Sequence, residues 1–398
     1  MDGRRLHSLQ HGCQTMSFRI VSDDSFSSDH TSLKYSASRR IKRGSGIQSG
    51  PAPRNILLTR LSAIGDCILT MPLAVDIKNL WPDSKLTWVV DCAAESLVGQ
   101  HESVDEVLRI EKRWLRNPSN WPTMRAELGR RKFDLVVDPQ GLTKSAALGW
   151  ISGAKERIGF GYSHAREVAP WLVNRRVRRT ARHMVDTYRE LLAPWSNVTP
   201  GRGRFAYPRF EQAAQSATSM LDKLDLNPVT GERFVLLNPG AGWETKIWPV
   251  QRFASLAREL FQQHGIKSVV SWAGPKEQLM ASAISENARG AAVALPDTDL
   301  MELSEIIRLA ALIVTGDTSA LHIASAVNTP CVALHGVTWA DECGPYGNQH
   351  VAIQSPMAPG GGKPIRRGAN TAMQAIEVDD ATQACEELLA QQISCRAA

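Results

Sequence analysis

The 398-residue chain is 43% hydrophobic and 22% charged, so it can form two domains of ordinary size, each with its own core. No apolar run approaches the roughly 20 residues of a bilayer-spanning helix, and the first 54 residues lack the apolar core of a secretory signal. The seven cysteines are scattered and form no CxxC pair. This usage excludes a disulfide framework and a zinc site and favours a reducing cytoplasm.

Most of the net charge of +6 lies at the amino terminus, because the first 54 residues hold nine Lys and Arg and only four Asp. Residues 1–53 are rich in Ser, Arg and Gly and are predicted to be a disordered tail. A basic tail favours anionic partners such as membrane lipid or nucleic acid, although a solvated tail without a partner is the preferred interpretation. The rest of the chain is almost neutral, so its overall charge says little about an active site.

From residue 55, short apolar strands alternate with helical stretches, the pattern of βαβ units in a parallel sheet. Strands are predicted at "NILLTR", "KLTWVVD" and "FDLVVDPQG", with a helix through Leu80 after the first and a helix from Ser145 after the third. A basic stretch, residues 159–182, is predicted to be irregular and to lead into the helical "MVDTYRELLAPW". The first domain is assigned to residues 54–200.

The Pro- and Gly-containing "SNVTPGRGRFAYPRF" interrupts this rhythm, as a domain linker would, and the alternation restarts in a second domain, residues 201–398. Strands are predicted at "FVLLNPGAG", "IKSVVSWAG", "LIVTGDTSA" and "PCVALHG", and helices at 250–264, from Pro275, at "LSEIIRLAA" and at 379–389. The predicted fold is therefore α/β, with two Rossmann-like halves facing across a cleft. Ligands of such sheets bind beyond the carboxyl ends of the strands.

The first polar group at a strand end is in "RLSAIGD". Gly65 is predicted to allow a tight turn between the strand and the helix, which places Asp66 in the first helical turn. The positive end of the helix dipole favours an ionised carboxylate there. Helix capping would explain Asp66 by itself, but an ionised aspartate in a cleft would also suit a general base.

The second group is "NPGAGWETKIWP", which follows the first strand of the second domain. Gly240 and Gly242 would leave backbone N–H groups exposed, and Lys246 adds a positive charge. Together they form a candidate phosphate site. The Gly-Lys-Ser/Thr of a Walker loop is absent, and a surface lysine in a loop would explain Lys246 alone.

The third group is "VTGDTSALHIASA". Asp317, Thr318 and Ser319 lie where a strand meets a helix, so free N–H groups would point into the cleft, and His322 follows one turn later. Capping would explain Asp317 or Thr318 alone, and a single helical His is usually structural. The combination is better suited to a diphosphate and its sugar.

The fourth group is basic. Lys144 and Arg166 lie near a strand end and in a loop of the first domain, where an anionic acceptor could approach, and Arg175 and Arg176 belong to the same basic region. A solvated basic face explains these residues equally well.

In this order, "RLSAIGD", "DPQGLTKSAAL", "NPGAGWETKIWP", "AGPKE" and "GDTSALHIASA" resemble the motifs of glycosyltransferase family 9, the ADP-heptose:lipopolysaccharide heptosyltransferases. The resemblance spans residues 55–395. "DPQGLTKSAAL" and "AREVAPWLVNRR" look most like heptosyltransferase I, which adds the first heptose to the Kdo sugar of the lipid A core. The resemblance implies a GT-B fold, with an acceptor half followed by a nucleotide-sugar half.

The resemblance also implies roles for individual residues. It places the catalytic base at Asp66 and the phosphate-binding lysine at Lys246. Acceptor contacts are assigned to Arg60, Lys144 and Arg166. Donor contacts are assigned to Gly240, Gly242, Thr245, Lys246, Glu277, Asp317, Thr318, Ser319 and His322.

Two positions depart from the family pattern. Ser319 stands where the family commonly has Gly, and a non-Gly residue tolerates positive φ poorly, so the donor diphosphate is expected to be held slightly differently. Residues 336–340, "GVTWA", replace the Gly-Pro-Thr-Asp-Pro that the family often has. The geometry of that loop is therefore expected to differ.

The resulting hypothesis is an inverting, metal-independent glycosyltransferase without a cofactor, because no DxD-like carboxylate pair stands in a matching context. Its expected partners are ADP-heptose, an anionic lipopolysaccharide core acceptor and, transiently, the inner face of the inner membrane, with no nucleic acid and a cytoplasmic location. Another nucleotide sugar or acceptor is one alternative. A non-catalytic nucleotide- or glycan-binding protein is another, although binding alone needs no base. A Rossmann oxidoreductase is opposed by the absence of GxGxxG after the first strand.

Overall fold

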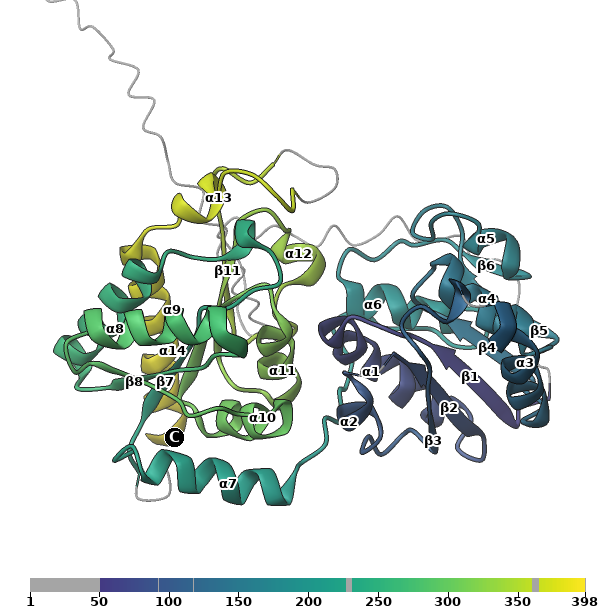
Figure 1. Cartoon of the computed structure of the whole chain (residues 1–398), viewed down its shortest axis with the longest axis horizontal. Helices are drawn as coiled ribbons and strands as arrows, with labels where there is room; N and C mark the ends of the chain where they lie inside the picture. The colour runs from purple at the N-terminus through teal and green to yellow at the C-terminus, as the bar shows by residue number, and fades with distance from the viewer. Residues whose placement is uncertain (1–50, 92, 117, 227–230, 360–364, 398) are drawn as a thin grey trace, which may run out of the picture.

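The computed structural model describes residues 51–91, 93–116, 118–226, 231–359 and 365–397. Nearly all of the predicted tail, residues 1–53, lies outside the described residues, so its disorder stays a prediction. The described chain forms two α/β halves that lie next to each other, each built on a six-stranded sheet (Figure 1).

The sheet of the N-terminal half is entirely parallel, with strand order β3-β2-β1-β4-β5-β6. In β1 the consecutive side chains of Ile56, Leu57 and Leu58 are all fully buried, because helices cover both faces of the sheet. The strands are β1 (Asn55–Thr59), β2 (Lys85–Val90), β3 (Glu106–Arg109), β4 (Leu135–Asp138), β5 (Glu156–Phe160) and β6 (Arg175–Val177).

Helices connect these strands. The longest of this half, α1, follows β1 and carries a run of buried side chains from Cys67 to Val75. The helices are α1 (Ile64–Leu80), α2 (Glu95–Val98), α3 (Trp121–Arg130), α4 (Thr143–Ile151), α5 (Ala169–Leu172) and α6 (Met184–Arg189), with 3-10 turns η1 (Trp114–Arg116), η2 (Pro118–Asn120) and η3 (Glu190–Leu192).

The sheet of the C-terminal half is also parallel and repeats the same topology, with order β12-β11-β10-β7-β8-β9. Its strands are β7 (Phe234–Asn238), β8 (Lys267–Val270), β9 (Ala292–Ala294), β10 (Leu312–Gly316), β11 (Cys331–His335) and β12 (Val351–Gln354). Its helices are α7 (Glu211–Asp222), α8 (Val250–His264), α9 (Gly274–Asn287), α10 (Leu300–Leu309), α11 (Ser319–Val327), α12 (Ala340–Cys343), α13 (Thr371–Gln374) and α14 (Val378–Ala397), with the 3-10 turn η5 (Glu244–Lys246).

Each sheet has one point at which the order of the strands reverses, between β1 and β4 in the first and between β7 and β10 in the second. The loops after two such strands leave in opposite directions, which opens a crevice at the carboxyl edge of the sheet. Three of the polar groups of the sequence follow β1, β7 and β10. The fourth, the basic group, follows β4 and the neighbouring strand β5. They are therefore all at the crevices.

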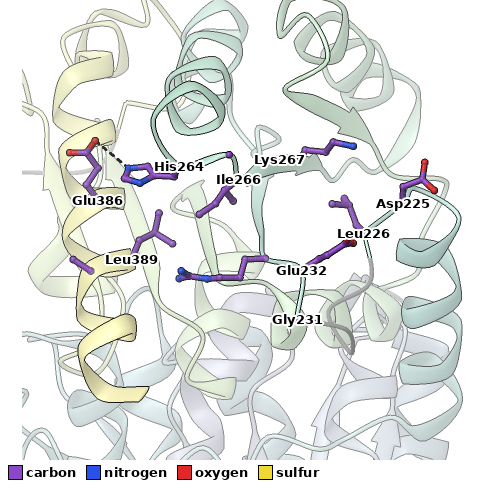
Figure 2. Close-up of a pocket in the computed structure, with 12 residues that line it drawn as sticks. Asp225, Leu226, Gly231, Glu232, His264, Ile266, Lys267, Glu386 and Leu389 are labelled. Atoms are coloured by element: carbon purple, nitrogen blue, oxygen red, sulfur yellow. Dashed lines mark ion pairs between the residues drawn. The ribbon is translucent and has the colours of Figure 1, made fainter. Parts of the chain in front are cut away.

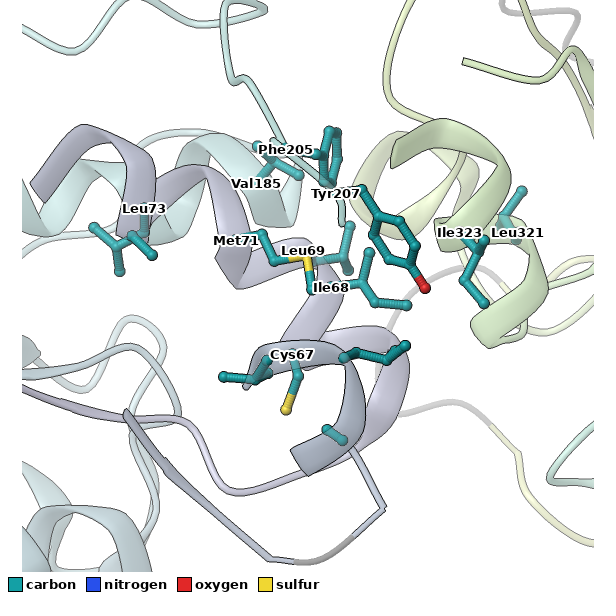
Figure 3. Packing of buried hydrophobic residues seen from close by; sticks show 14 of the residues in the cluster. Cys67, Ile68, Leu69, Met71, Leu73, Val185, Phe205, Tyr207, Leu321 and Ile323 are labelled. Atoms are coloured by element: carbon teal, nitrogen blue, oxygen red, sulfur yellow. The ribbon is translucent and has the colours of Figure 1, made fainter. Parts of the chain in front are cut away.

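Apolar side chains fill the contact between the two halves. Figure 3 shows residues of α1 close to Phe205 and Tyr207 of the linker and to Leu321 and Ile323 of α11. The hydroxyl of Tyr207 also makes a 2.8 Å hydrogen bond with Ser304 Oγ. The chain between η3 and α7 is therefore packed against both halves, and α1 is in direct contact with α11.

The structure corrects one local prediction. Residues 159–182 were predicted to be irregular, but they complete β5 and form α5 and the strand β6, whose sequence is Arg-Arg-Val. β6 lies at the edge of the sheet, where a strand needs no apolar pattern on both faces. The short strands β3, β9 and β12 were not predicted either. Among the described residues, no helix is long and apolar enough to cross a membrane.

Candidate active site

Asp66 lies in the first turn of α1, at the carboxyl end of β1. Its Oδ1 accepts hydrogen bonds from Nη2 of Arg60 at 2.5 Å and from the hydroxyl of Tyr188 at 3.3 Å. Its Oδ2 accepts the N–H of Ala63, the N-cap residue of α1, at 3.3 Å. The side chain is 40% exposed, so one oxygen is held in place while the other can still accept a proton from a ligand. Helix capping and a role as base are therefore compatible.

Arg60, predicted to contact the acceptor, is buried directly behind Asp66. Its guanidinium lies 4.9 Å from the centre of the Tyr188 ring, and its Nη1 donates to the carbonyl of Pro139 at 3.4 Å. Burial opposes the charge of Arg60, but attraction to Asp66 and Tyr188 outweighs it and raises the pKa of the guanidinium. For Tyr188, in contrast, burial is the main cause of the raised pKa of the hydroxyl. The carboxylate of Asp66 is thus held by two groups: Arg60, which stays positively charged, and Tyr188, which stays neutral and donates a hydrogen bond.

Gly65 was predicted to permit a tight turn, but the structure shows a different role. Gly65 is helical, and a Cβ added to it would lie 2.6 Å from Cδ2 of His322 in the other half. The missing side chain therefore lets α1 and α11 approach closely. As a result Asp66 lies next to the predicted donor residues of α11.

We expect Gly65→Ala to lower kcat/KM about tenfold or more, because an α1–α11 shift would misplace Asp66 relative to the donor. Gly129→Ala in α3 is the matched control, since a Cβ there meets nothing within 4 Å and alanine favours a helix. Steady-state kinetics and melting temperatures of both variants test this. Wild-type activity in Gly65→Ala would show that the contact is not needed for catalysis.

Among the predicted donor residues, Lys246 of η5 and Asp317, which follows β10, form an ion pair. Nζ of Lys246 lies 2.6 Å from Asp317 Oδ2, and Asp317 Oδ1 lies 3.6 Å from Nε2 of His322. Burial opposes ionisation of Asp317, but the hydrogen bond with His322 and the charge of Lys246 hold the pKa of this carboxyl well below its usual value. Nδ1 of His322 is buried without a partner among the described residues. Three of the predicted donor residues are thus in direct contact.

Lys246 also contacts an aromatic ring that the sequence analysis did not single out. Its Nζ lies 4.1 Å from the centre of the Trp243 ring, and the guanidinium of Arg366 lies 4.5 Å from the same ring. The Gly-rich turn after β7 therefore combines two cations around one indole. A tryptophan directly after a Gly-Ala-Gly turn was the available signal for Trp243, whereas Arg366 is distant in sequence and had no such signal.

The remaining predicted donor residues surround this turn. The carboxyl group of Glu277 lies against Gly240, where an added Cβ would come within 2.3 Å of its oxygens. Gly242 has open space around its Cα. The hydroxyl of Thr245 is turned away, since it donates to the carbonyl of Ile365 at 2.7 Å.

Thr318 and Ser319 begin α11. Thr318 is the N-cap residue, and its hydroxyl lies 3.1 Å from that of Thr315 and 3.4 Å from Nδ2 of Asn238. Ser319 is the first helical residue and is not among the described non-glycine residues with positive φ. Serine therefore causes no backbone strain there, although a glycine is common in the family. The free N–H groups of this turn remain available for an anion.

Among the predicted acceptor residues, Lys144 lies beside the loop that leads to Asp66. Its Nζ donates to Ser62 Oγ at 3.0 Å and pairs with Asp91 at 3.4 Å. Gln140, which the sequence analysis missed, accepts the N–H of Leu61 at 2.9 Å and so ties the turn after β4 to the same loop.

The side chain of Arg166 is exposed, and its N–H donates to the carbonyl of Gly141 at 2.8 Å. Lys144 and Arg166 are thus close to the carboxyl ends of β4 and β5, where the acceptor was predicted to bind. Arg175 differs, because its guanidinium pairs with Glu156 and lies 4.5 Å from the Trp195 ring. It is therefore not free for an acceptor.

A cavity of about 540 Å³ lies elsewhere, between α14, the start of β8 and the chain before β7 (Figure 2). His264 and Glu386 form a 3.5 Å ion pair at its wall. None of the predicted site residues lines it, and the strand ends that carry the motifs are at the opposite edge of the sheet. The predicted site residues therefore lie at the crevice and not at this cavity. Within the described residues no group of three or more His, Cys, Asp or Glu side chains is arranged to hold a metal ion.

Two parallel six-stranded sheets of Rossmann order, in halves that meet where α1 contacts α11, are the architecture of the GT-B fold. The family model of glycosyltransferase family 9 (heptosyltransferase) matches residues 121–361, more than half of the chain. This protein therefore belongs to glycosyltransferase family 9.

Two relatives illustrate the similarity. Lipopolysaccharide heptosyltransferase 1 of Pseudomonas aeruginosa is 28% identical over 315 residues, which are 76% of this chain and 85% of the relative. The enzyme of the same name from Escherichia coli K12 is 26% identical over 310 residues, 76% of this chain and 93% of the relative.

Two solved structures share the fold. A family 9 glycosyltransferase of Veillonella parvula has a TM-score of 0.71 at 20% identity and covers 85% of this chain and 97% of its own. The E. coli heptosyltransferase WaaC with ADP has a TM-score of 0.67 at 23% identity. The match covers 84% of this chain and 99% of WaaC. The predicted GT-B fold and family are thus confirmed.

Proposed function

We propose that this enzyme transfers a heptose from ADP-heptose to a Kdo–lipid A acceptor of the lipopolysaccharide inner core, with inversion and without a metal ion. The observation that carries the proposal is the contact of Gly65 with His322. This contact sets α1, with the partly exposed carboxylate of Asp66, against the first turns of α11, where His322 pairs with Asp317, the partner of Lys246. An acceptor hydroxyl and a sugar diphosphate bound at these two places would meet.

In this mechanism Asp66 removes the proton from the acceptor hydroxyl as that oxygen attacks the anomeric carbon. The bond to the diphosphate breaks, and its negative charge grows. Lys246 and the free N–H groups at the start of α11 stabilise that charge, which is a preorganised electrostatic contribution. Displacement from the opposite face inverts the anomeric centre. Asp317, close to Lys246, is suited to hold sugar hydroxyl groups, because a carboxylate accepts hydrogen bonds and would repel a phosphate.

The names of the relatives support the substrate class, and the contacts of Lys144 and the exposed Arg166 support an anionic acceptor. The reaction would take place in the cytoplasm, at the inner face of the inner membrane, where the enzyme associates only peripherally.

The direct test incubates the protein with a panel of nucleotide sugars and measures release of nucleoside diphosphate with and without Kdo–lipid A. We expect release that depends on both ADP-heptose and the acceptor. Transfer from another nucleotide sugar would show that the donor is not ADP-heptose. Binding without turnover would favour a non-catalytic binding protein.

We expect full activity in excess EDTA. The charge on the leaving diphosphate is met by Lys246 and the α11 N-terminus, so no divalent ion is needed for that step. The rate with EDTA is compared with the rate after addition of Mg²⁺ or Mn²⁺. A rate that rises with either ion would contradict this account of the leaving group.

Arg166→Ala is expected to raise the acceptor KM several-fold with little change in the donor KM. The exposed guanidinium acts on the anionic acceptor through solvent, so salt should weaken its effect. The salt dependence of the wild type should therefore be steeper than that of the variant. Arg202, on the linker, provides an exposed arginine as control. Equal changes of both KM values, or only a lower melting temperature, would assign Arg166 a structural role.

A further inference from the structure

Large apolar side chains are exposed around α4 and α5 of the N-terminal half. Trp150 is 54% exposed, Tyr162 66%, Val168 50% and Trp171 73%. The described residues include nine exposed large hydrophobic side chains, and these four fall within 22 residues of sequence. Single exposed apolar residues are ordinary, but a group of them marks an interaction surface.

The fold holds these residues together. α4 packs against α5, the N–H of Trp171 donates to the carbonyl of Val168 at 3.0 Å, and Nε of Arg176 donates to the carbonyl of Pro170 at 2.7 Å. In Figure 1, α4, α5 and β6 lie together on the side of the N-terminal half away from the C-terminal half. We call this group the α4–α5 surface. It consists of Trp150, Tyr162, Arg166, Val168, Trp171 and Arg176.

The charge of this region is strongly one-sided. Residues 155–182 contain eight Lys and Arg and two Glu, whereas the body as a whole, this stretch included, is close to neutral. Both carboxylates are engaged, since Glu156 pairs with Arg175 and Glu167 accepts the N–H of Thr143. Within the described residues, neither Arg166 nor Arg176 pairs with a carboxylate. Positive charge is thus available beside exposed aromatic rings.

We propose that the α4–α5 surface docks on an anionic lipid bilayer. Trp and Tyr rings favour the zone between headgroups and acyl chains, and arginines bind lipid phosphates and the negative surface potential. The complementary charge and the aromatic rings together fit this partner. The inference rests on the proposed function in one respect, namely that docking brings the N-terminal half close to a lipid-anchored acceptor.

Vesicle sedimentation with the full-length protein tests the proposal. The wild type is compared with the Trp150→Ser/Trp171→Ser double variant, using vesicles of phosphatidylglycerol and phosphatidylcholine and vesicles of phosphatidylcholine alone. We expect binding to the anionic vesicles that salt weakens, and a loss of at least about tenfold in the double variant. Arg176→Gln should lose about fivefold. The basic residues 1–53 are present in every protein, so these differences report on the surface itself.

The matched control is Phe261→Ser/Leu279→Ser in the C-terminal half, where Leu279 is as exposed as Trp171. It should bind vesicles like the wild type. Melting temperatures show whether each variant is folded. Equal binding of the wild type and Trp150→Ser/Trp171→Ser overturns the proposal. So does equal binding to neutral and anionic vesicles, or a self-association in sedimentation velocity that the double variant abolishes.

A second readout separates this proposal from the proposed function. Trp150→Ser/Trp171→Ser should keep the wild-type kcat on a water-soluble, deacylated acceptor and lose activity only on acceptor in vesicles. If the wild type transfers no heptose but binds vesicles as expected, the proposed function is wrong and the docking proposal is supported. If the wild type transfers heptose and the double variant is equally active on acceptor in vesicles, only the docking proposal is wrong.

Discussion

Asp66→Asn is expected to lower kcat by about 10²–10⁴-fold, the usual contribution of a general base. The amide keeps the shape of the side chain, and its oxygen can still accept the hydrogen bonds of Arg60 and Tyr188. It cannot take a proton from the acceptor hydroxyl. Donor affinity should remain nearly unchanged, because Lys246 and the start of α11 are not altered. Single-turnover kinetics together with titration of ADP measure the two effects separately.

Loss of charge at Asp66 also removes the partner of the buried Arg60, so stability needs its own control. Asp105 provides it, since its side chain is 39% exposed and pairs with Lys78 at 3.0 Å, a situation close to that of Asp66 but outside the crevice. Asp105→Asn should change the melting temperature similarly and leave kcat intact. If Asp66→Asn retained the wild-type kcat, Asp66 would serve only as a helix-capping residue.

Lys246→Ala is expected to lower kcat by about 10²-fold and to raise the Kd for nucleoside diphosphate. Its charge meets the phosphate oxygens, whose charge increases toward the transition state, so the chemical step should suffer as well as binding. Lys276→Ala is the matched control, because Lys276 is also paired with a carboxylate, Glu244 at 2.8 Å, but is well exposed. Calorimetric titration and kcat of both variants are the measurements.

The ion pair of Lys246 with Asp317 allows a sharper version of this experiment. Removing the lysine leaves a buried carboxylate beside the diphosphate site, and that charge alone would repel the ligand. The double variant Lys246→Ala/Asp317→Asn removes it. We expect the double variant to remain defective, since the cation is still missing. Diphosphate binding restored to the wild-type level would mean that Lys246 only neutralises Asp317.

The sequence by itself determined most of the architecture and the places where the chemistry can occur. Helix and strand periods are local properties, so α1 ends at Leu80 and α8 spans residues 250–264, as the pattern predicted. Glycine and polar residues at strand ends are local signals too. Given parallel sheets, they indicated the crevices at β1, β4, β7 and β10. Edge strands such as β6 were not predicted, because an edge position does not require a continuous run of apolar residues.

Only the tertiary structure decided how these places act on one another. The partners of Asp66 are Arg60 and Tyr188, the latter 122 positions away, and the pair of Lys246 and Asp317 spans 71 positions. Gly65 appeared to be a turn residue, but its role depends on His322 of the other half. Local sequence patterns do not encode which side chains meet across a fold, because that depends on how α1 packs on α11. The residue types were visible in the chain, and their electrostatic environment was set by packing.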